Sequence, residues 1–263
     1  MDYRFDLKEL WFLLEQFTPA TIVGIKNPYV GWLAEETELI QREALKSLVD
    51  RDLVRMIAND EIALEESVAS LVDVCAHADH SLITNWWHCH NDRQSYAYFA
   101  DGLIVEIIEI EPGIYNLSSL ENTNALSQSL MDAIYSSASS SGESFQLLLE
   151  LLESTRSLCQ EGKSAEAQKI LEEGSKLKSK EINRLLKALA ATVANSSFVL
   201  LANRNSPDAQ YVSGFAVLEG QDDLWVMQVD EQNGKRMVTF NPANANMVLE
   251  HFLEIMPAGY RDR

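Results

Sequence analysis

The chain has 263 residues, of which 46% are hydrophobic and 23% charged, the balance of a globular protein rather than a disordered one. Its net charge of −19, from 40 acidic against 21 basic residues, repels nucleic acid phosphates and anionic lipid headgroups. No window reaches the roughly 18 uninterrupted apolar residues that a membrane span needs, and the N-terminus lacks a signal-peptide pattern. We therefore expect a cytoplasmic protein, and three cysteines, an odd number, favour reduced thiols over a disulfide framework.

Two amphipathic helices, a hairpin and a third helix are predicted in the first 75 residues. Apolar residues at three- and four-residue steps mark the helices, and turn residues mark the hairpin. The predicted bounds are helices over Leu7–Phe17 and Glu35–Asp50, strands over Leu53–Met56 and Ile62–Leu64 around an Asn59-Asp60 turn, and a helix from Glu65 to about Val74. This order is typical of a winged-helix arrangement, in which the helix before the hairpin can lie in a DNA groove.

The charge of that second helix argues against DNA binding. Between Glu35 and Asp52 there are six acidic residues against three basic ones. This is the wrong sign for a phosphate backbone, so we interpret the hairpin as structural. An acidic winged-helix transcriptional regulator is kept as an alternative function.

From residue 81 the pattern changes to that of strands. Turns are predicted at Asp101-Gly102 and Pro112-Gly113. The strands are predicted over Ile83–Trp87, Tyr96–Ala100, Leu103–Ile110 and Ile114–Leu117, with a helix over about Asn122–Tyr135 and a Ser-rich linker over Ser136–Ser144.

The same order recurs near the C-terminus. Strands are predicted over Phe198–Ala202, Tyr211–Leu218, Leu224–Val229 and Met237–Phe240, with an Asn233-Gly234 turn and a helix over about Asn244–Met256. Leu103 and Leu224 align at an offset of 121 positions, 224 minus 103, and Gly113 and Gly234 align at the same offset. Agreement of strand, turn, strand and helix together indicates a duplicated ββββα unit.

A helical insert separates the two copies. Residues Phe145–Ala194 carry eight Lys or Arg against seven Glu, so the rest of the chain holds about −20. The predicted organisation is a first half over residues 1–144, the helical insert over 145–194 and a second sheet-and-helix half over 195–263, all in one compact domain.

Four of the five histidines and two cysteines fall between Cys75 and His90. His77 with His80, and His88 with His90, could share faces and together hold a metal such as zinc. None of these pairs has a recognised zinc-ligand spacing, so the preferred interpretation is a polar turn, with a metal-dependent enzyme as a second alternative function. We expect no cofactor and no metal.

Carboxylates offer the remaining acid-base candidates. Asp222 and Asp223 fall in a predicted turn, and Glu106, Glu109 and Glu111 line a strand. Solvated side chains explain them without catalysis, so no catalytic residue is assigned and the chain is interpreted as not an enzyme.

Apolar residues on the open face of a sheet, together with the basic insert, are the candidate contacts for a protein partner. Trp225, Met227 and Val229 share one face of a predicted strand. The insert contributes Lys176, Lys180 and Arg184.

The layout resembles the EspG family of type VII secretion chaperones. The residues that carry the resemblance are the winged-helix-like start, the Asp-Gly hairpin before Leu103–Ile108, and the stretch Leu224–Val229 through Asn233–Ala243 into an amphipathic helix. The resemblance implies a quasi-two-fold α+β fold with a central antiparallel sheet. It also implies a cytosolic chaperone that keeps the helical tip of a secreted PE-PPE heterodimer soluble until export, without a cofactor. The partner expected is an amphipathic helical secreted protein, with the chain itself a monomer or a dimer.

Overall fold

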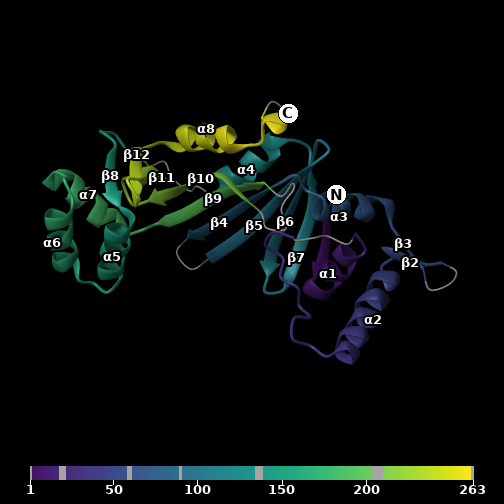
Figure 1. Cartoon of the computed structure of the whole chain (residues 1–263). Coiled ribbons are helices and arrows are strands. Elements are labelled where there is room, and N and C mark those ends of the chain that lie inside the picture. The colour runs from purple at the N-terminus through teal and green to yellow at the C-terminus, as the bar shows by residue number, and fades with distance from the viewer. Residues whose placement is uncertain are drawn as a thin grey trace.

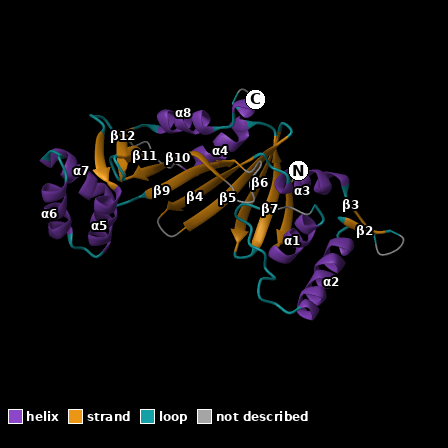
Figure 2. Ribbon diagram, viewed as in Figure 1, coloured by secondary structure: helices purple, strands orange, loops and turns teal. Residues whose placement is uncertain are grey.

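An antiparallel sheet forms the centre of the computed structural model (Figure 1), which describes residues 2–17, 22–57, 61–88, 91–133, 139–202 and 210–261. Within these ranges the sheet has ten strands in the order β1-β7-β6-β5-β4-β9-β10-β11-β12-β8. Helices lie on both of its faces, as Figure 2 shows. None of the described helices is long and apolar enough to cross a membrane. The α+β fold class is confirmed.

The duplicated ββββα unit is confirmed. Each copy runs through four neighbouring strands and ends in a helix. The first copy is β4 (His80–His88), β5 (Asn91–Ala100), β6 (Leu103–Glu111), β7 (Ile114–Leu120) and α4 (Thr123–Ala133). The second is β9 (Ala194–Ala202), β10 (Gln210–Glu219), β11 (Leu224–Gln232), β12 (Lys235–Pro242) and α8 (Ala245–Ile255), before a short 3-10 turn over Ala258–Tyr260.

The repeat is longer than the sequence indicated. Each half begins with an edge strand, β1 (Asp2–Asp6) beside β7 and β8 (Phe145–Leu148) beside β12. Residues 145–148, predicted as helical, are therefore a strand, because Phe145 and Leu147 bury alternate side chains. Three helices follow each edge strand, α1 (Leu7–Glu15), α2 (Ala34–Asp50) and α3 (Glu66–Ala76) in one half and α5 (Leu149–Gln160), α6 (Ser164–Gly174) and α7 (Ser179–Ala190) in the other. The helical insert is the counterpart of the N-terminal helices.

The winged-helix-like start has the predicted elements. A small separate hairpin of β2 (Val54–Met56) and β3 (Ile62–Leu64) lies between α2 and α3. The predicted Asn59-Asp60 turn lies outside the described residues.

The predicted hairpin turns have the backbone geometry that their residues allow. Asp101 and Gly102 between β5 and β6 have φ of 50° and 80°, and Asn233 and Gly234 between β11 and β12 have φ of 53° and 73°. A two-residue turn with both φ values positive matches the right-handed twist of the flanking strands, and Asn, Asp and Gly tolerate it best. These turns fix the register of the pairs on either side.

The side-chain faces correct the alignment of the two copies by one residue. Leu103 is 44% exposed whereas Leu224 is fully buried, and the two side chains point to opposite faces of the sheet, because Leu103 pairs with Ala100 of the first core cluster and Leu224 belongs to the second. The pairing gives an offset of 121 after the irregularity between Glu109 and Glu111 and of 122 before it, so Ile104, which pairs with Leu120, corresponds to Val226, which pairs with Asn241. A bulge inserts one extra residue in a strand, and the sequence pattern did not reveal it.

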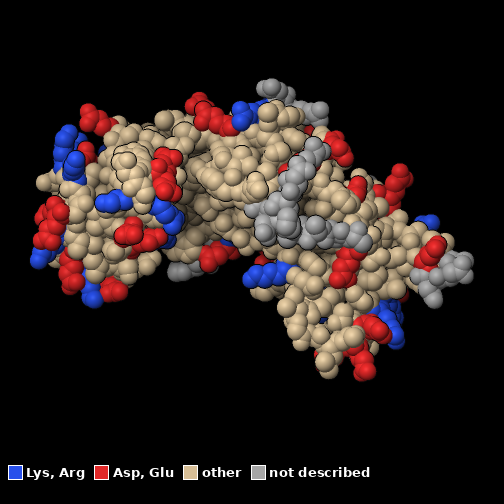
Figure 3. All heavy atoms as spheres, viewed as in Figure 1, with Lys and Arg blue, Asp and Glu red and all other residues tan. Residues whose placement is uncertain are grey.

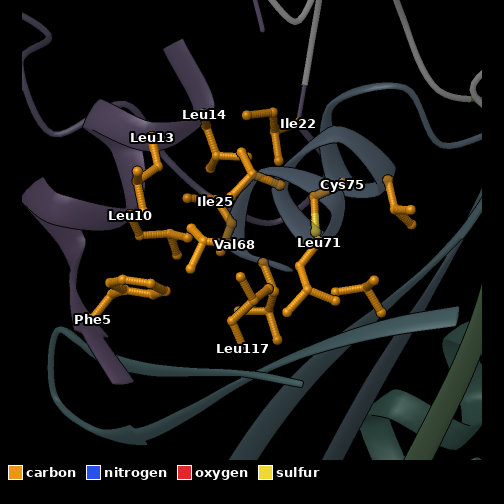
Figure 4. Close-up of a cluster of buried hydrophobic side chains, with 14 of the residues drawn as sticks. Phe5, Leu10, Leu13, Leu14, Ile22, Ile25, Val68, Leu71, Cys75 and Leu117 are labelled. Carbon is orange, nitrogen blue, oxygen red and sulfur yellow. The ribbon is translucent and has the colours of Figure 1, made fainter. Parts of the chain in front are cut away.

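Three clusters of buried side chains hold the helices to the sheet. One lies under α1 and α3 and includes Phe5, Leu10 and Leu117 (Figure 4). A second packs α4 and α8 onto the opposite face of the sheet, and a third packs α5, α6 and α7 onto the same face as the first. The strand pairing shows that these two clusters share a face. Ile83, which packs on the first cluster, pairs with Val199, and Val199 pairs with Gly214. Ala216, two residues after Gly214 and so on the same face, pairs with Met227, which packs on the third cluster.

One carboxyl group is buried in this framework. Glu106 of β6 is 4% exposed and points to the same face as Ala97, beside Ser118. Burial, which disfavours the charged form, raises the pKa of Glu106 to about 7, although a hydrogen bond with Ser95 opposes the shift.

Replacing Glu106 by Gln should remove a pH dependence of stability. The folded pKa of about 7 exceeds the ordinary value of 4.5, so the stability that the protonated carboxyl contributes is present below pH 4.5 and is lost as pH rises to 7. Relative to Glu106→Gln, the free energy of unfolding of the wild type should fall by about 3 kcal/mol across this window. Urea unfolding at several pH values measures this difference, and parallel curves for the two proteins would contradict it.

Candidate partner-binding groove

A groove of about 1380 Å³ crosses the sheet face that carries the first and third clusters. Its floor comes from β4, β9, β10 and β11. Leu149, Leu152 and Arg156 of α5 form one wall, and Ile110 and Pro112 at the β6–β7 end line the other side. In Figure 3 the α5–α7 lobe and the α1–α2 lobe project on the same side of the sheet with a hollow between them.

The floor of the groove is polar along the line where the two halves meet. Asn85 of β4 donates from Nδ2 to Oγ of Ser197 of β9 at 3.3 Å. Gln94 of β5 donates from Nε2 to Oδ1 of Asn85 at 2.6 Å. This chain of side chains crosses three neighbouring strands and leaves amide groups available to a partner.

The rim of the groove exposes large apolar side chains. Tyr211 is 65% exposed, Val229 and Ile110 are each 47% exposed, and Trp87 is 39% exposed. They come from β10, β11, β6 and β4, far apart in sequence. Exposed apolar groups gathered around a concave surface mark an interaction site more strongly than the same groups scattered singly.

Charged groups of both signs flank these apolar residues. Arg93, Arg156 and Arg236 line the groove together with five carboxylates. Glu109 accepts a hydrogen bond from the backbone N–H of Gly113 at 2.7 Å, and Glu111 pairs with Arg4 at 2.9 Å. These two carboxylates, candidates for acid-base chemistry in the sequence, thus serve the β6–β7 turn and the edge strand.

The structure separates the three strand residues predicted to contact a partner. Met227 and Val229 line the groove. Trp225 is fully buried in the third cluster, where its ring meets Phe240 edge to face with centroids 6.4 Å apart. Its side chain is packed in the core and presents no surface to a partner, because the α5–α7 helices cover this end of the strand.

Arg184 holds the second half together rather than facing outward. Its Nε donates to Oδ1 of Asp223 at 3.2 Å, and its guanidinium carbon lies 5.4 Å from the centre of the Trp225 ring. Its Nη1 donates to the carbonyl oxygen of Ser141 at 3.0 Å. The neighbouring Asp222 pairs with Lys187, so the predicted Asp222-Asp223 turn is an anchor for α7.

The linker between the halves is fastened at the same place. Ser140 donates from Oγ to Asp223 at 3.1 Å and accepts from the backbone N–H of Leu224 at 2.8 Å. Lys176 and Lys180 are exposed in the α6–α7 region, and neither lines the groove.

The histidine cluster is dispersed where the structure describes it. His77, at the end of α3, contacts Asp73 at 2.8 Å between Nδ1 and Oδ1, and His80 begins β4. His90 and the side chain of His88 lie outside the described residues. Among the described residues, no three metal-ligating side chains come together.

Sequence reasoning missed most of the groove. Trp87, Ile110 and Tyr211 stand at strand ends, where the alternating pattern does not tell a buried side chain from an exposed one. A signal was present in the mixture of exposed aromatic and charged residues on neighbouring strands. Recognising this signal requires the strand order β4-β9-β10-β11, which places these residues side by side.

No protein-family model and no curated protein matches the chain. Its fold is similar to that of the type VII secretion system chaperone EspG5 from Mycobacterium tuberculosis, whose structure was solved in complex with the PE25-PPE41 dimer. The TM-score is 0.70 and the sequence identity 13%, and the likeness covers 98% of each chain. The fold that the resemblance to the EspG family implies is confirmed.

Replacing Arg184 by Met should destabilise the protein, because Asp223 and Ser141 lose a largely buried charged donor. The free energy of unfolding should fall by about 2 kcal/mol. Urea denaturation measures the change. Lys178→Met is the matched control, since Lys178 pairs with Glu143 across 3.8 Å with both side chains more than three-quarters exposed, and it should cost no more than about 0.5 kcal/mol. Equal effects of the two substitutions would contradict the anchoring role.

Proposed function

We propose that this chain is a cytosolic chaperone of a type VII-like secretion system, with a helical secreted protein as its client. It binds the client through the groove across its sheet and keeps that client soluble before export. The observation that carries the proposal is the open groove with an apolar rim, in a fold that a secretion chaperone shares over 98% of its length.

The size of the groove supports a protein client over a small molecule. Its volume of about 1380 Å³ exceeds the roughly 300–1000 Å³ of common small-molecule pockets. The rim residues Trp87, Tyr211 and Val229 stand on three strands and surround a broad concave surface rather than a deep cavity. Such a surface accommodates the end of a pair of helices, whose tip would otherwise expose apolar side chains to water.

The apolar and the polar groups of the groove have different roles in binding a client. Burying the apolar rim against a client supplies most of the favourable free energy. The polar floor at Asn85 and Ser197 can bind the main-chain groups at the end of a client helix, which have no partner within the helix. Arg93, Arg156 and Arg236 would pair with client carboxylates and select its orientation.

The acidic surface suits a chaperone. A net charge of −19 keeps the free protein soluble and separates copies from one another while an apolar groove is exposed. The same charge disfavours the alternative of a transcriptional regulator, because the exposed acidic residues of α2 would face the phosphates of a DNA groove.

The proposal is tested by co-purification. The full chain, tagged and expressed in its native host, should retain a helical secreted heterodimer of the PE-PPE kind, identified by mass spectrometry. Recovery of the chain without such a protein, although the host expresses one, would contradict the proposal.

Replacing Val229 by Arg should weaken client binding at least tenfold, because a charge is placed on the apolar rim. Isothermal titration calorimetry with the purified client measures the dissociation constant. Leu103→Arg is the matched control, since Leu103 is 44% exposed on the equivalent strand β6 and does not line the groove. A loss of affinity from the control as large as from Val229→Arg would place the client elsewhere.

A further inference from the structure

The two ends of the sheet differ in how they are protected. The end strands β1 and β8 correspond to each other in the two halves. An edge strand exposes unpaired main-chain N–H and C=O groups, and proteins commonly block such edges with charged residues or covering groups. The comparison of β1 with β8 therefore tells which edge is open to another strand.

The edge at β1 is blocked. Its five residues include Asp2, Arg4 and Asp6. Arg51 donates from Nη2 to the carbonyl oxygen of Arg4 at 2.6 Å, and Arg4 itself pairs with Glu111. The charged side chains of β1 and the hydrogen bond from Arg51 thus hinder pairing of this edge with another strand.

The edge at β8 has neither form of protection. Its residues Phe145, Gln146, Leu147 and Leu148 carry no charge. Within the described part of the chain, no side chain donates a hydrogen bond to the main chain of these four residues as Arg51 does on β1. Their pairing with β12 uses one side of the strand, and among the described residues no strand pairs with the other side.

A separate pocket of about 710 Å³ lies along this open edge. It is lined by β8, by residues 174–178 of the α6–α7 connection, and by Met237 and Thr239 of β12. These two side chains alternate with Val238, which lines the groove, so the pocket opens on the other face of the sheet. The pocket shares no lining residue with the groove.

The charge beside the pocket favours a particular kind of segment. Lys176, Lys178 and Glu181 line it, so cations outnumber carboxylates in the lining. Lys178 lies 3.8 Å from Glu143 and its backbone N–H donates to Glu181, whereas no ion pair of Lys176 is found among the described residues. An acidic side chain on an added strand would pair with Lys176. A second copy of this chain would instead bring the same lysines together across a two-fold axis.

We propose that β8 is a second docking site, at which an extended acidic segment of a partner protein pairs with the open edge and extends the sheet by one strand. Main-chain hydrogen bonds hold the segment, and alternate side chains enter the pocket beside Lys176. This site does not depend on the groove, and it leaves the groove free for the client of the proposed function.

The test uses the full chain and a synthetic peptide of alternating valine and glutamate, with a valine and lysine peptide as the contrast. Hydrogen–deuterium exchange should show protection of residues 145–148 with the acidic peptide. Fluorescence anisotropy should give an affinity at least tenfold lower for the basic peptide. Protection in the groove in place of β8, or no protection, would overturn the proposal.

Two variants that change the net charge by the same amount test whether Lys176 contacts the acidic segment. Lys176→Glu should weaken binding of the acidic peptide at least fivefold, whereas Lys169→Glu on the exposed face of α6 should leave it unchanged. Circular dichroism checks that both variants are folded. Equal affinities of the two variants, or concentration-dependent dimers through β8 in sedimentation experiments, would also overturn the proposal.

Discussion

The pairing of β4 with β9 is the contact on which the rest of the molecule depends. Nine residues of each strand pair antiparallel, from His80 with Ala202 to His88 with Ala194, and this ladder joins two half-sheets into one. The quasi-two-fold relation places three helices on the same face at each end of the sheet. A groove between two helical lobes follows from that symmetry, and its polar floor at Asn85 and Ser197 lies on the ladder itself.

Much of the fold could be predicted from local chemistry. Asp101-Gly102 and Asn233-Gly234 specify two-residue hairpins because they accept positive φ, and the alternating strands around them identify the repeat. The edge strands could not be predicted in the same way. Five residues at the N-terminus and Phe145–Leu148 are too short to show a period, and they become strands by pairing with β7 and β12.

The candidate site was harder to predict than the fold because exposure depends on what covers a strand. Trp225 and Val229 share one face of β11, yet the first is buried beneath the α5–α7 helices and the second stands 47% exposed in the groove. Arg184 has the sequence signature of a surface cation, and its bond to Asp223, 39 residues away, can be seen only in three dimensions.

The central ladder also bears on how the chain folds. The four strands of each ββββα unit pair with near neighbours in sequence, whereas β4 and β9 join residues that are 106 or more positions apart, 194 minus 88 at the nearest point. The edge strand β1 also pairs over a long range, with β7 at 108 or more positions, 114 minus 6. Closing so long a loop has a large entropic cost, and contacts of this kind form late. We expect each four-stranded unit to assemble first and the ladder to close afterwards. A nascent molecule would then acquire its groove only at the last stage of folding, so that incompletely folded copies offer no such surface.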